Sequence, residues 1–193
     1  MLASHVIFGA YGFWLPNDPR GSWSDFVASW NLFRHGGHAT KTNETQSLAY
    51  RPHDQELRMG AKSLLKRPPV QFNGLQARAI AKGFAEYATR SDLKILACAV
   101  MPDHMHLVLG CHRLSPKQLV VQLKGAASRR LIADDLHPFP NKVGRPEKCF
   151  ARGEWKVYLD TEDEVNHAIR YVNLNPEKEG LRRQYWSFIM PWA

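Results

Sequence analysis

Two short apolar runs, residues 93–100 and 104–111, limit the fold more than any other feature of this sequence. Both are short and contain Val, Leu or Ile, which favours buried strands over helices. The residues between them, Met101-Pro102-Asp103, favour a turn because Pro and Asp suit turn positions. The sequence therefore predicts a hairpin of two antiparallel strands, against which the rest of the chain has to pack.

The flanking segments supply the other elements. Runs rich in apolar and aromatic residues predict a strand before and a strand after the hairpin. Apolar residues at helical spacing predict three helices. In chain order we expect a strand (4–13), an insertion (about 14–70), a helix (72–90), the hairpin, a helix (115–133), a loop (134–148), a strand (150–159) and a helix (161–175).

Two of the helices have recognisable starts. Ser115 with Gln118, and Thr161 with Glu164, have the spacing of a capping box, in which two side chains satisfy backbone N–H groups at the helix start. The last helix is expected to end just before Pro176, since proline lacks a backbone donor and disfavours helix in the residue before it.

This order predicts an α+β fold. Up to the fourth strand it is βαββαβ, the order of a ferredoxin-like or RRM-like antiparallel sheet, with one further helix at the C-terminal side. We expect residues 1–193 to form a single domain with the insertion after the first strand. Many functions share this layout, so the fold alone does not select one.

The insertion admits two interpretations. It opens with the turn-rich segment 14–21 (WLPNDPRG) and carries Trp14, Trp23 and Trp30 among basic residues. Tryptophans beside arginines can stack on unpaired bases. They can also fix a long loop by packing, and this second interpretation is the commoner one.

Composition favours a polyanionic partner. Lys and Arg number 26 against 18 Asp and Glu, giving a net charge of +8, and nucleic acid is the commonest polyanion. Cys98, Cys111 and Cys149 lack the spacing of a disulfide framework or zinc site, and we expect Cys98 and Cys111 to be small core residues. There is no long apolar run and no signal peptide at the start, so we expect no membrane contact and a cytoplasmic location.

His104 and His106 are the first candidates for chemistry. Side chains two residues apart on a strand point to the same face, so two imidazoles can share a metal ion there, while Met105 faces the core. A lone His-x-His pair also arises by chance on a solvated strand.

Tyr171 and Asn175 are the second candidates. On the last helix they lie four residues apart, beside the apolar stripe, and therefore project together. An amide oxygen can complete a metal site, and a phenol can attack a polarised phosphorus. The alternative is a half-buried tyrosine and a helix-terminal asparagine. His167, one turn earlier, is expected to be a solvated histidine.

The two groups together resemble a known family. Residues 101–109 (MPDHMHLVL) resemble the His-hydrophobic-His strand of the single-tyrosine HUH transposases, and residues 169–181 (IRYVNLNPEKEGL) look like their tyrosine helix. The Asn-Pro ending is similar to the branch that acts on repetitive extragenic palindromes (REP). Residues 14–21 also resemble a stretch near the start of some members. The likeness covers the first strand and most of 72–181, but gives no account of 22–69.

The resemblance implies roles for these residues. Tyr171 would be the nucleophile that forms a 5′-phosphotyrosine and releases a 3′-hydroxyl. His104, His106 and Asn175 would bind Mg²⁺ or Mn²⁺. Lys124, on the helix after the histidine strand, would be the best of three DNA-binding candidates, which are Lys124, Arg129 and Arg130; the alternative for each is a solvated helix face.

The expected function is thus a single-stranded DNA endonuclease and strand transferase acting on hairpin or palindromic DNA, as a monomer or homodimer. Two alternatives stay open. One is a non-catalytic or domesticated single-stranded nucleic-acid-binding protein that uses the sheet and its aromatic residues. The other is a replication initiator or relaxase, although these enzymes often have longer chains and a different histidine spacing.

Overall fold

The computed structural model of the chain describes residues 1–42, 48–49, 51–139 and 147–192. The chain divides into two compact units. One consists of Met1–Ala10 with Gln71–Ala193, and the other is Tyr11–Val70. The second unit corresponds closely to the expected insertion. That the two together act as one domain stays a prediction.

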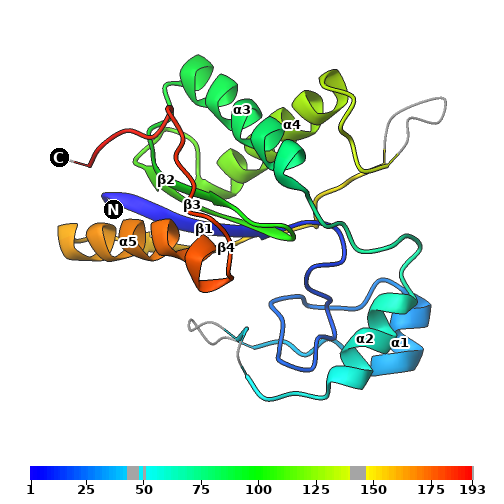
Figure 1. The fold of residues 1–193 in the computed structure, drawn as a ribbon. Helices are drawn as coiled ribbons and strands as arrows, with labels where there is room; N and C mark the ends of the chain where they lie inside the picture. The colour runs from blue at the N-terminus through cyan, green and yellow to red at the C-terminus, as the bar shows by residue number, and fades with distance from the viewer. Residues whose placement is uncertain (43–47, 50, 140–146, 193) are drawn as a thin grey trace. The chain divides into compact units, whose positions relative to one another are not determined.

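The first unit is built on a four-stranded sheet (Figure 1). Its strands are β1 (Ala3–Gly9), β2 (Ile95–Val100), β3 (His104–Gly110) and β4 (Trp155–Leu159), in the spatial order β2-β3-β1-β4. All three pairings are antiparallel. The first and third strands are therefore neighbours at the centre, and the predicted α+β, ferredoxin-like arrangement is confirmed.

Helices cover both faces of this sheet. In Figure 1, α3 (Gly74–Ser91) and α4 (Pro116–Ala133) lie together on one face, and α5 (Glu162–Lys178) lies on the other. Both predicted capping boxes are present, at the starts of α4 and α5. A third capping box, formed by Asn73 and Gln76, starts α3.

The face under α3 and α4 is an apolar core. Val6, Phe8, Met105 and Leu107 are at most 2% exposed, and the Phe8 ring meets the ring of Phe84 on α3 edge-on. The expected apolar stripe of α4 is buried as well, whereas Leu75, expected in the stripe of α3, is exposed.

The two helices approach closely at Gly83. A Cβ placed there would lie 2.8 Å from the carbonyl oxygen of Ala126 on α4. Any larger residue at this position would push the helices apart.

The face under α5 combines apolar and polar residues. Val165, Ala168 and Val172 of α5 pack on Ala97 and Val108 of the strands. This confirms the stripe expected for the last helix, in which Ile169 is partly buried.

The prediction that the last helix ends before Pro176 is wrong. Pro176 lies inside α5, which runs to Lys178. The end of the helix is held by alternative bonds: the N–H of Glu179 donates to the carbonyls of Asn175 and Pro176, and the N–H of Leu181 donates to that of Pro176. These bonds satisfy carbonyls at the C-terminal end of the helix, where Pro176 needs no donor of its own to continue the last turn.

The chain after α5 returns to the sheet edge. The side-chain amide of Gln184 accepts from the N–H of Val100 at 2.9 Å and donates to its carbonyl at 2.8 Å. The N–H of Met190 donates to the carbonyl of Ile95. The tail therefore covers the open edge of β2, which would otherwise expose unpaired backbone groups.

The second unit contains two short helices, α1 (Trp30–Gly36) and α2 (Gln55–Ser63). Neither was predicted. Each has a local N-cap, Ser29 and Asp54, whose side chain accepts a backbone N–H. A small core of Leu15, Leu32 and Ala61 lies in this unit.

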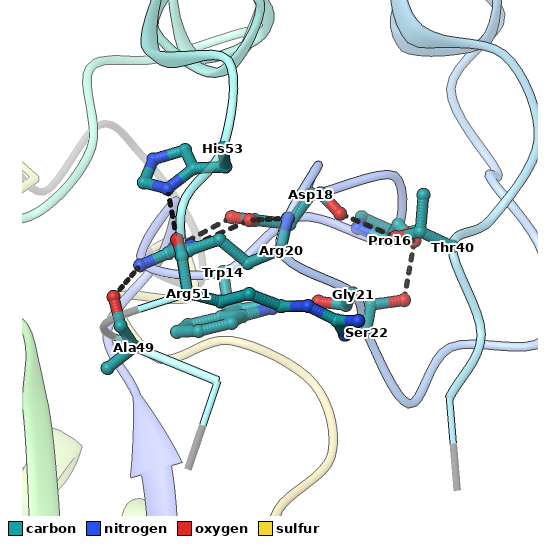
Figure 2. A network of polar contacts seen from close by, with 10 residues as sticks. All are labelled: Trp14, Pro16, Asp18, Arg20, Gly21, Ser22, Thr40, Ala49, Arg51 and His53. Atoms are coloured by element: carbon teal, nitrogen blue, oxygen red, sulfur yellow. Dashed lines mark hydrogen bonds and ion pairs between the residues drawn. The ribbon is translucent and has the colours of Figure 1, made fainter. Parts of the chain in front are cut away.

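A buried polar network organises the turn-rich segment, as Figure 2 shows. Asp18 and Arg20 are 1% and 6% exposed and form two parallel bonds of 2.8 Å. The Arg20 guanidinium lies 3.7 Å from the ring centre of Trp14, whose Nε1 donates to the carbonyl of Gly21. Because both charges are paired and hydrogen-bonded, their burial is tolerated.

The packing interpretation of the insertion tryptophans holds for Trp14, and base stacking by Trp23 or Trp30 stays a prediction. Trp14 fixes the segment by packing and hydrogen bonding. Trp30 is 68% exposed and stacks on Phe33, and Trp23 is 42% exposed. Residues 43–47 and 50 of the expected insertion lie outside the described residues.

The structure also bears on the cysteines, the loop at 134–148 and the expected absence of a membrane-spanning helix. Cys98 is buried as expected, but Cys111 is exposed, because it follows the last residue of β3 and the buried pattern ends there. The described part of the loop at 134–148 has no helix or strand, and residues 140–146 lie outside it. Within the described ranges, no helix is both long and apolar enough to cross a membrane.

Candidate functional site

The two histidines of β3 face α5. His104 and His106 are the first and third residues of the strand, and their ring centres lie 4.8 Å apart. His106 is 3% exposed, whereas Met105 between them points into the opposite core and is fully buried. The structure therefore brings the two imidazoles together on one face, as alternation along a strand requires.

Tyr171 comes to the same place from α5. Its ring centre lies 5.7 Å from that of His106, edge-on. The two residues are far apart in sequence, and the packing of α5 on the sheet joins them. Tyr171 is half-buried, which leaves part of the side chain open to a substrate.

Asn175 lies one turn after Tyr171 and is 5% exposed. Its side-chain Nδ2 is buried and has no hydrogen-bond partner. A buried amide without a partner is unfavourable in a native protein and calls for an explanation. The two ends of an amide are assigned by their surroundings, so the oxygen can equally occupy this position.

His5 is a residue that the sequence interpretation missed. The register of β1 and β3 pairs His5 with Val108 and Ile7 with His106, so His5 and His106 are diagonal neighbours on one face. Their Nε2 and Nδ1 atoms lie 3.3 Å apart, and the His5 ring also meets Tyr171 and Trp155 edge-on. Burial lowers the pKa of His5 to about 4.

The partners of the two strand histidines indicate which nitrogen carries the proton. Nδ1 of His104 lies 2.7 Å from a carboxylate oxygen of Asp103 and therefore donates to it. Burial, with the neighbouring His104 and His5, holds the pKa of His106 well below its ordinary value, so its ring is neutral. If Nδ1 of His106 donates to His5, Nε2 is the unprotonated atom of His106. This is the tautomer in which an imidazole binds a metal through Nε2.

A cation and a cavity adjoin these residues. The ammonium of Lys178 lies 4.7 Å from the ring centre of Tyr171. A cavity of about 230 Å³ is lined by Asp103 and His104 at the start of β3 and by Glu179 and Leu181 after α5. The cavity gives His104 access to a small ligand or a strand of the substrate.

Lys124 lies on the opposite side of the sheet. Its ammonium donates to the carbonyls of Ala151 and Gly153 and lies 5.1 Å from the ring centre of Phe8. Burial lowers its pKa to about 8, although the Glu154 carboxylate opposes the shift. A role of Lys124 in DNA binding stays a prediction, and the structure gives it a structural partner as well.

The two arginines of α4 differ in how far their charges are paired. Arg130 is paired with Asp134 and with Glu86, so its charge is largely compensated. Arg129 is exposed, as is His167 on α5. Neither arginine is near the histidine pair in any contact described above, and their roles in DNA binding stay predictions.

The described residues contain no group of three or more His, Cys, Asp and Glu side chains that would hold a metal. The predicted set is of another kind: the imidazoles of His104 and His106, the second of them held neutral by burial, and one buried amide that lacks a partner. Such donors fit a divalent cation that keeps part of its shell for water and phosphate oxygens. Imidazole ligands favour Mn²⁺ over Mg²⁺, which prefers oxygen.

One signal in the sequence pointed to His5. It is a histidine in an otherwise apolar strand, and the predicted βαββαβ order already placed that strand beside the one carrying His104 and His106. The register was missing, and only the register decides which residues are neighbours.

Comparisons with known proteins indicate similarity to transposases. Residues 66–153 match the family model described as "Transposase IS200 like". The matched residues include both strand histidines and the α4 cations, whereas Tyr171 and Asn175 lie beyond them. No curated protein matches the chain.

Two solved structures are similar at low identity. One is a REP-associated tyrosine transposase bound to a REP hairpin, with 18% identity, a TM-score of 0.46, and coverage of 64% of this chain and 70% of that one. The other is a proposed transposase from Deinococcus radiodurans R1, with 15% identity, a TM-score of 0.39, and coverage of 95% and 92%. Both scores lie below 0.5, so neither likeness establishes a shared fold. The match to the family model covers residues 66–153, less than half of the chain, and shows that this stretch is similar to IS200-like transposases.

Proposed function

We propose that this protein is a metal-dependent endonuclease and strand transferase for single-stranded or hairpin DNA, with Tyr171 as the nucleophile. The observation that carries the proposal is the meeting of Tyr171 with His106, at 5.7 Å between ring centres, on the face that also holds His104. The family match at 66–153 supports a transposase, and the net charge of +8 supports DNA as the partner.

His104, His106 and Asn175 are the residues that would hold the cation, Mg²⁺ or Mn²⁺. When bound, it would supply positive charge to the phosphate oxygens as negative charge develops on them. Asp103 and His5 orient the two imidazoles through their Nδ1 atoms. This fixes both rings before the substrate arrives, so little reorganisation is needed during the reaction.

Tyr171 would attack the scissile phosphorus. The bond between its phenol oxygen and phosphorus forms as the bond from phosphorus to the 3′ oxygen breaks. The phenol proton passes to water, and the departing 3′ oxygen takes up a proton, giving a 3′-hydroxyl and a 5′-phosphotyrosine. Attack by another 3′-hydroxyl reverses these steps and joins the strands without ATP, because the ester bond is conserved.

Lys178 assists the nucleophile in this proposal. A free phenol has a pKa near 10 and is protonated at neutral pH. The Lys178 ammonium at 4.7 Å from the ring centre favours negative charge on the phenol oxygen as the attack proceeds.

The proposal is tested with a labelled hairpin oligonucleotide that has single-stranded flanks, incubated with the protein and Mn²⁺ and run on a denaturing gel. We expect a covalent adduct with the wild type and none with Tyr171→Phe. Tyr158→Phe is the matched control, because Tyr158 is 48% exposed and pairs with Ser4 on the α3–α4 side of the sheet. It should form the adduct normally.

Tight DNA binding without an adduct, across hairpins of different sequence and with both metals, would contradict catalysis and favour the non-catalytic binding protein. Size-exclusion chromatography with light scattering decides between a monomer and a homodimer, and mixing Tyr171→Phe with His104→Ala protein tests whether active sites are shared.

A further inference from the structure

A groove of about 580 Å³ lies between α3 and the C-terminal tail. Its walls are residues of α3, the end of α4 and tail residues 185–188. The tail is held on both sides of this stretch, by Gln184 on Val100 and by Met190 on Ile95. Residues 185–188 are thus a fixed part of the surface, on the opposite side of the sheet edge from Tyr171.

Aromatic rings and cations line the groove together. Tyr185 is 80% exposed, and the rings of Trp186 and Phe188 stack with 6.3 Å between centres. Arg78 and Lys82, four residues apart on α3, share one face of that helix. An exposed aromatic ring beside cations is the combination that binds a base by its face and a phosphate by its charge.

Asp134 also lines the groove. Its carboxylate is hydrogen-bonded to the Arg130 guanidinium, and Arg130 together with Lys82 holds its pKa below the ordinary value. The cations Arg78, Lys82 and Arg130 outnumber the carboxylates Asp134 and Glu86, so these charges leave the groove positive.

Trp186 adds a donor that has no acceptor. Its Nε1 is buried and unpartnered in the described part of the chain. Buried donors are nearly always satisfied, by protein, water or ligand. An oxygen or ring nitrogen of a bound base would provide the acceptor.

We propose that this groove binds an unpaired nucleotide of single-stranded DNA. Its base stacks on Tyr185, an acceptor on the base takes the N–H of Trp186, and Arg78 and Lys82 contact the adjoining phosphates. The choice of DNA rests on the proposed function, but the binding itself needs neither metal nor Tyr171. The groove is thus a second binding site for single-stranded DNA, separate from the catalytic face.

The test measures binding of fluorescein-labelled dT10 by anisotropy, with the full-length chain, without metal and in the Tyr171→Phe background. The result therefore does not depend on whether the wild-type protein cleaves DNA. Tyr185→Ala should weaken binding by about 5- to 150-fold, the range found for loss of one stacked base. Tyr185→Phe, which keeps the ring, should bind like its parent. Tyr158→Ala is the control for loss of an exposed tyrosine elsewhere.

A second measurement tests the cations. Arg78→Gln with Lys82→Gln should reduce the slope of log affinity against log salt by about 1.4, since each single-strand phosphate contributes about 0.7. Lys117→Gln, at an exposed lysine of α4, should lower it less.

Equal affinity for rU10 would broaden the ligand to any single strand and still support the groove. The inference is overturned if Tyr185→Ala binds dT10 like its parent, if Tyr185→Phe is as weak as Tyr185→Ala, or if a blunt duplex shows the same dependence on Tyr185. Because Tyr185 is 80% exposed, its variants should keep the melting temperature of the parent, which circular dichroism checks.

Discussion

The two faces of the sheet are built from the same strands but differ in kind. Under α3 and α4, the middle of the sheet is apolar and closely packed, as Val6, Phe8 and Met105 illustrate. Under α5, His5 and His106 are buried on the strands, and Asn175 is buried on the helix above them. Burying polar groups reduces stability unless they are satisfied, and the amide of Asn175 is not.

Polar residues buried under α5 mark that face of the sheet as the functional one. A sequence optimised for stability alone would continue the apolar pattern on both faces, and departures from it are expected at functional sites. Neighbouring residues of β3 allow a direct test, since His104, Met105 and His106 alternate between the two faces.

The largest expected effect comes from the histidine face. His104→Ala should reduce cleavage of a hairpin oligonucleotide by more than about 10³-fold, because it removes an expected ligand of the charge-stabilising cation. Binding of the same oligonucleotide, measured by anisotropy, should change little. Cleavage within tenfold of wild type would place the chemistry elsewhere.

The adjacent residue should behave in the opposite way. Met105→Ala should lower the free energy of unfolding by about 2–5 kcal/mol, because it leaves a cavity in a close-packed core. Urea unfolding measures this. Cleavage by the fraction that remains folded should persist. If Met105→Ala lost cleavage as fully as His104→Ala while staying folded, the two faces would not be functionally distinct.

Much of this contrast was predictable, because alternation and capping are local signals. The apolar runs at 93–100 and 104–111, with the Ser115 and Thr161 caps, specified the order and type of the elements around the sheet. The register was not predictable, and so His5 was missed. Pro176 lies in the last turn of α5, where carbonyls accept bonds from Glu179 and Leu181 that follow it, and a rule for the preceding residues does not include these. The helices α1 and α2 are too short for a periodic pattern to stand out.

A smaller effect is expected from the partner of His106. His5→Phe should weaken Mn²⁺ binding by about 10- to 100-fold, the usual effect of removing a group that orients a metal ligand. Isothermal titration calorimetry without DNA measures this affinity, and His167→Phe is the control at an exposed histidine. Imidazole nitrogen NMR of the metal-free protein should show His106 protonated at Nδ1. Unchanged Mn²⁺ affinity, or a proton on Nε2, would remove His5 from the site.

The last effect concerns stability alone, at Lys124 on the apolar face. Its folded pKa of about 8 lies below its ordinary 10.5, so between these pH values the unfolded chain holds more protons than the folded one. The free energy of unfolding should therefore rise with pH in this window, by up to about 3 kcal/mol from this group. Lys124→Met should lack that part of the rise in paired urea titrations. If the free energy of unfolding rose equally with pH in the wild type and in Lys124→Met, the ammonium of Lys124 would not be buried.

The proposed reaction requires one covalent bond, between the phenol oxygen of Tyr171 and a 5′ phosphate of the DNA. Protein incubated with a hairpin oligonucleotide and Mn²⁺ is digested with trypsin and nuclease, and the peptides are analysed by mass spectrometry. We predict a nucleotide joined through its 5′ phosphate to the peptide that contains Tyr171, and to no other tyrosine. An adduct on a different residue, or a strand cut without any adduct, would contradict the assignment of Tyr171 as the nucleophile.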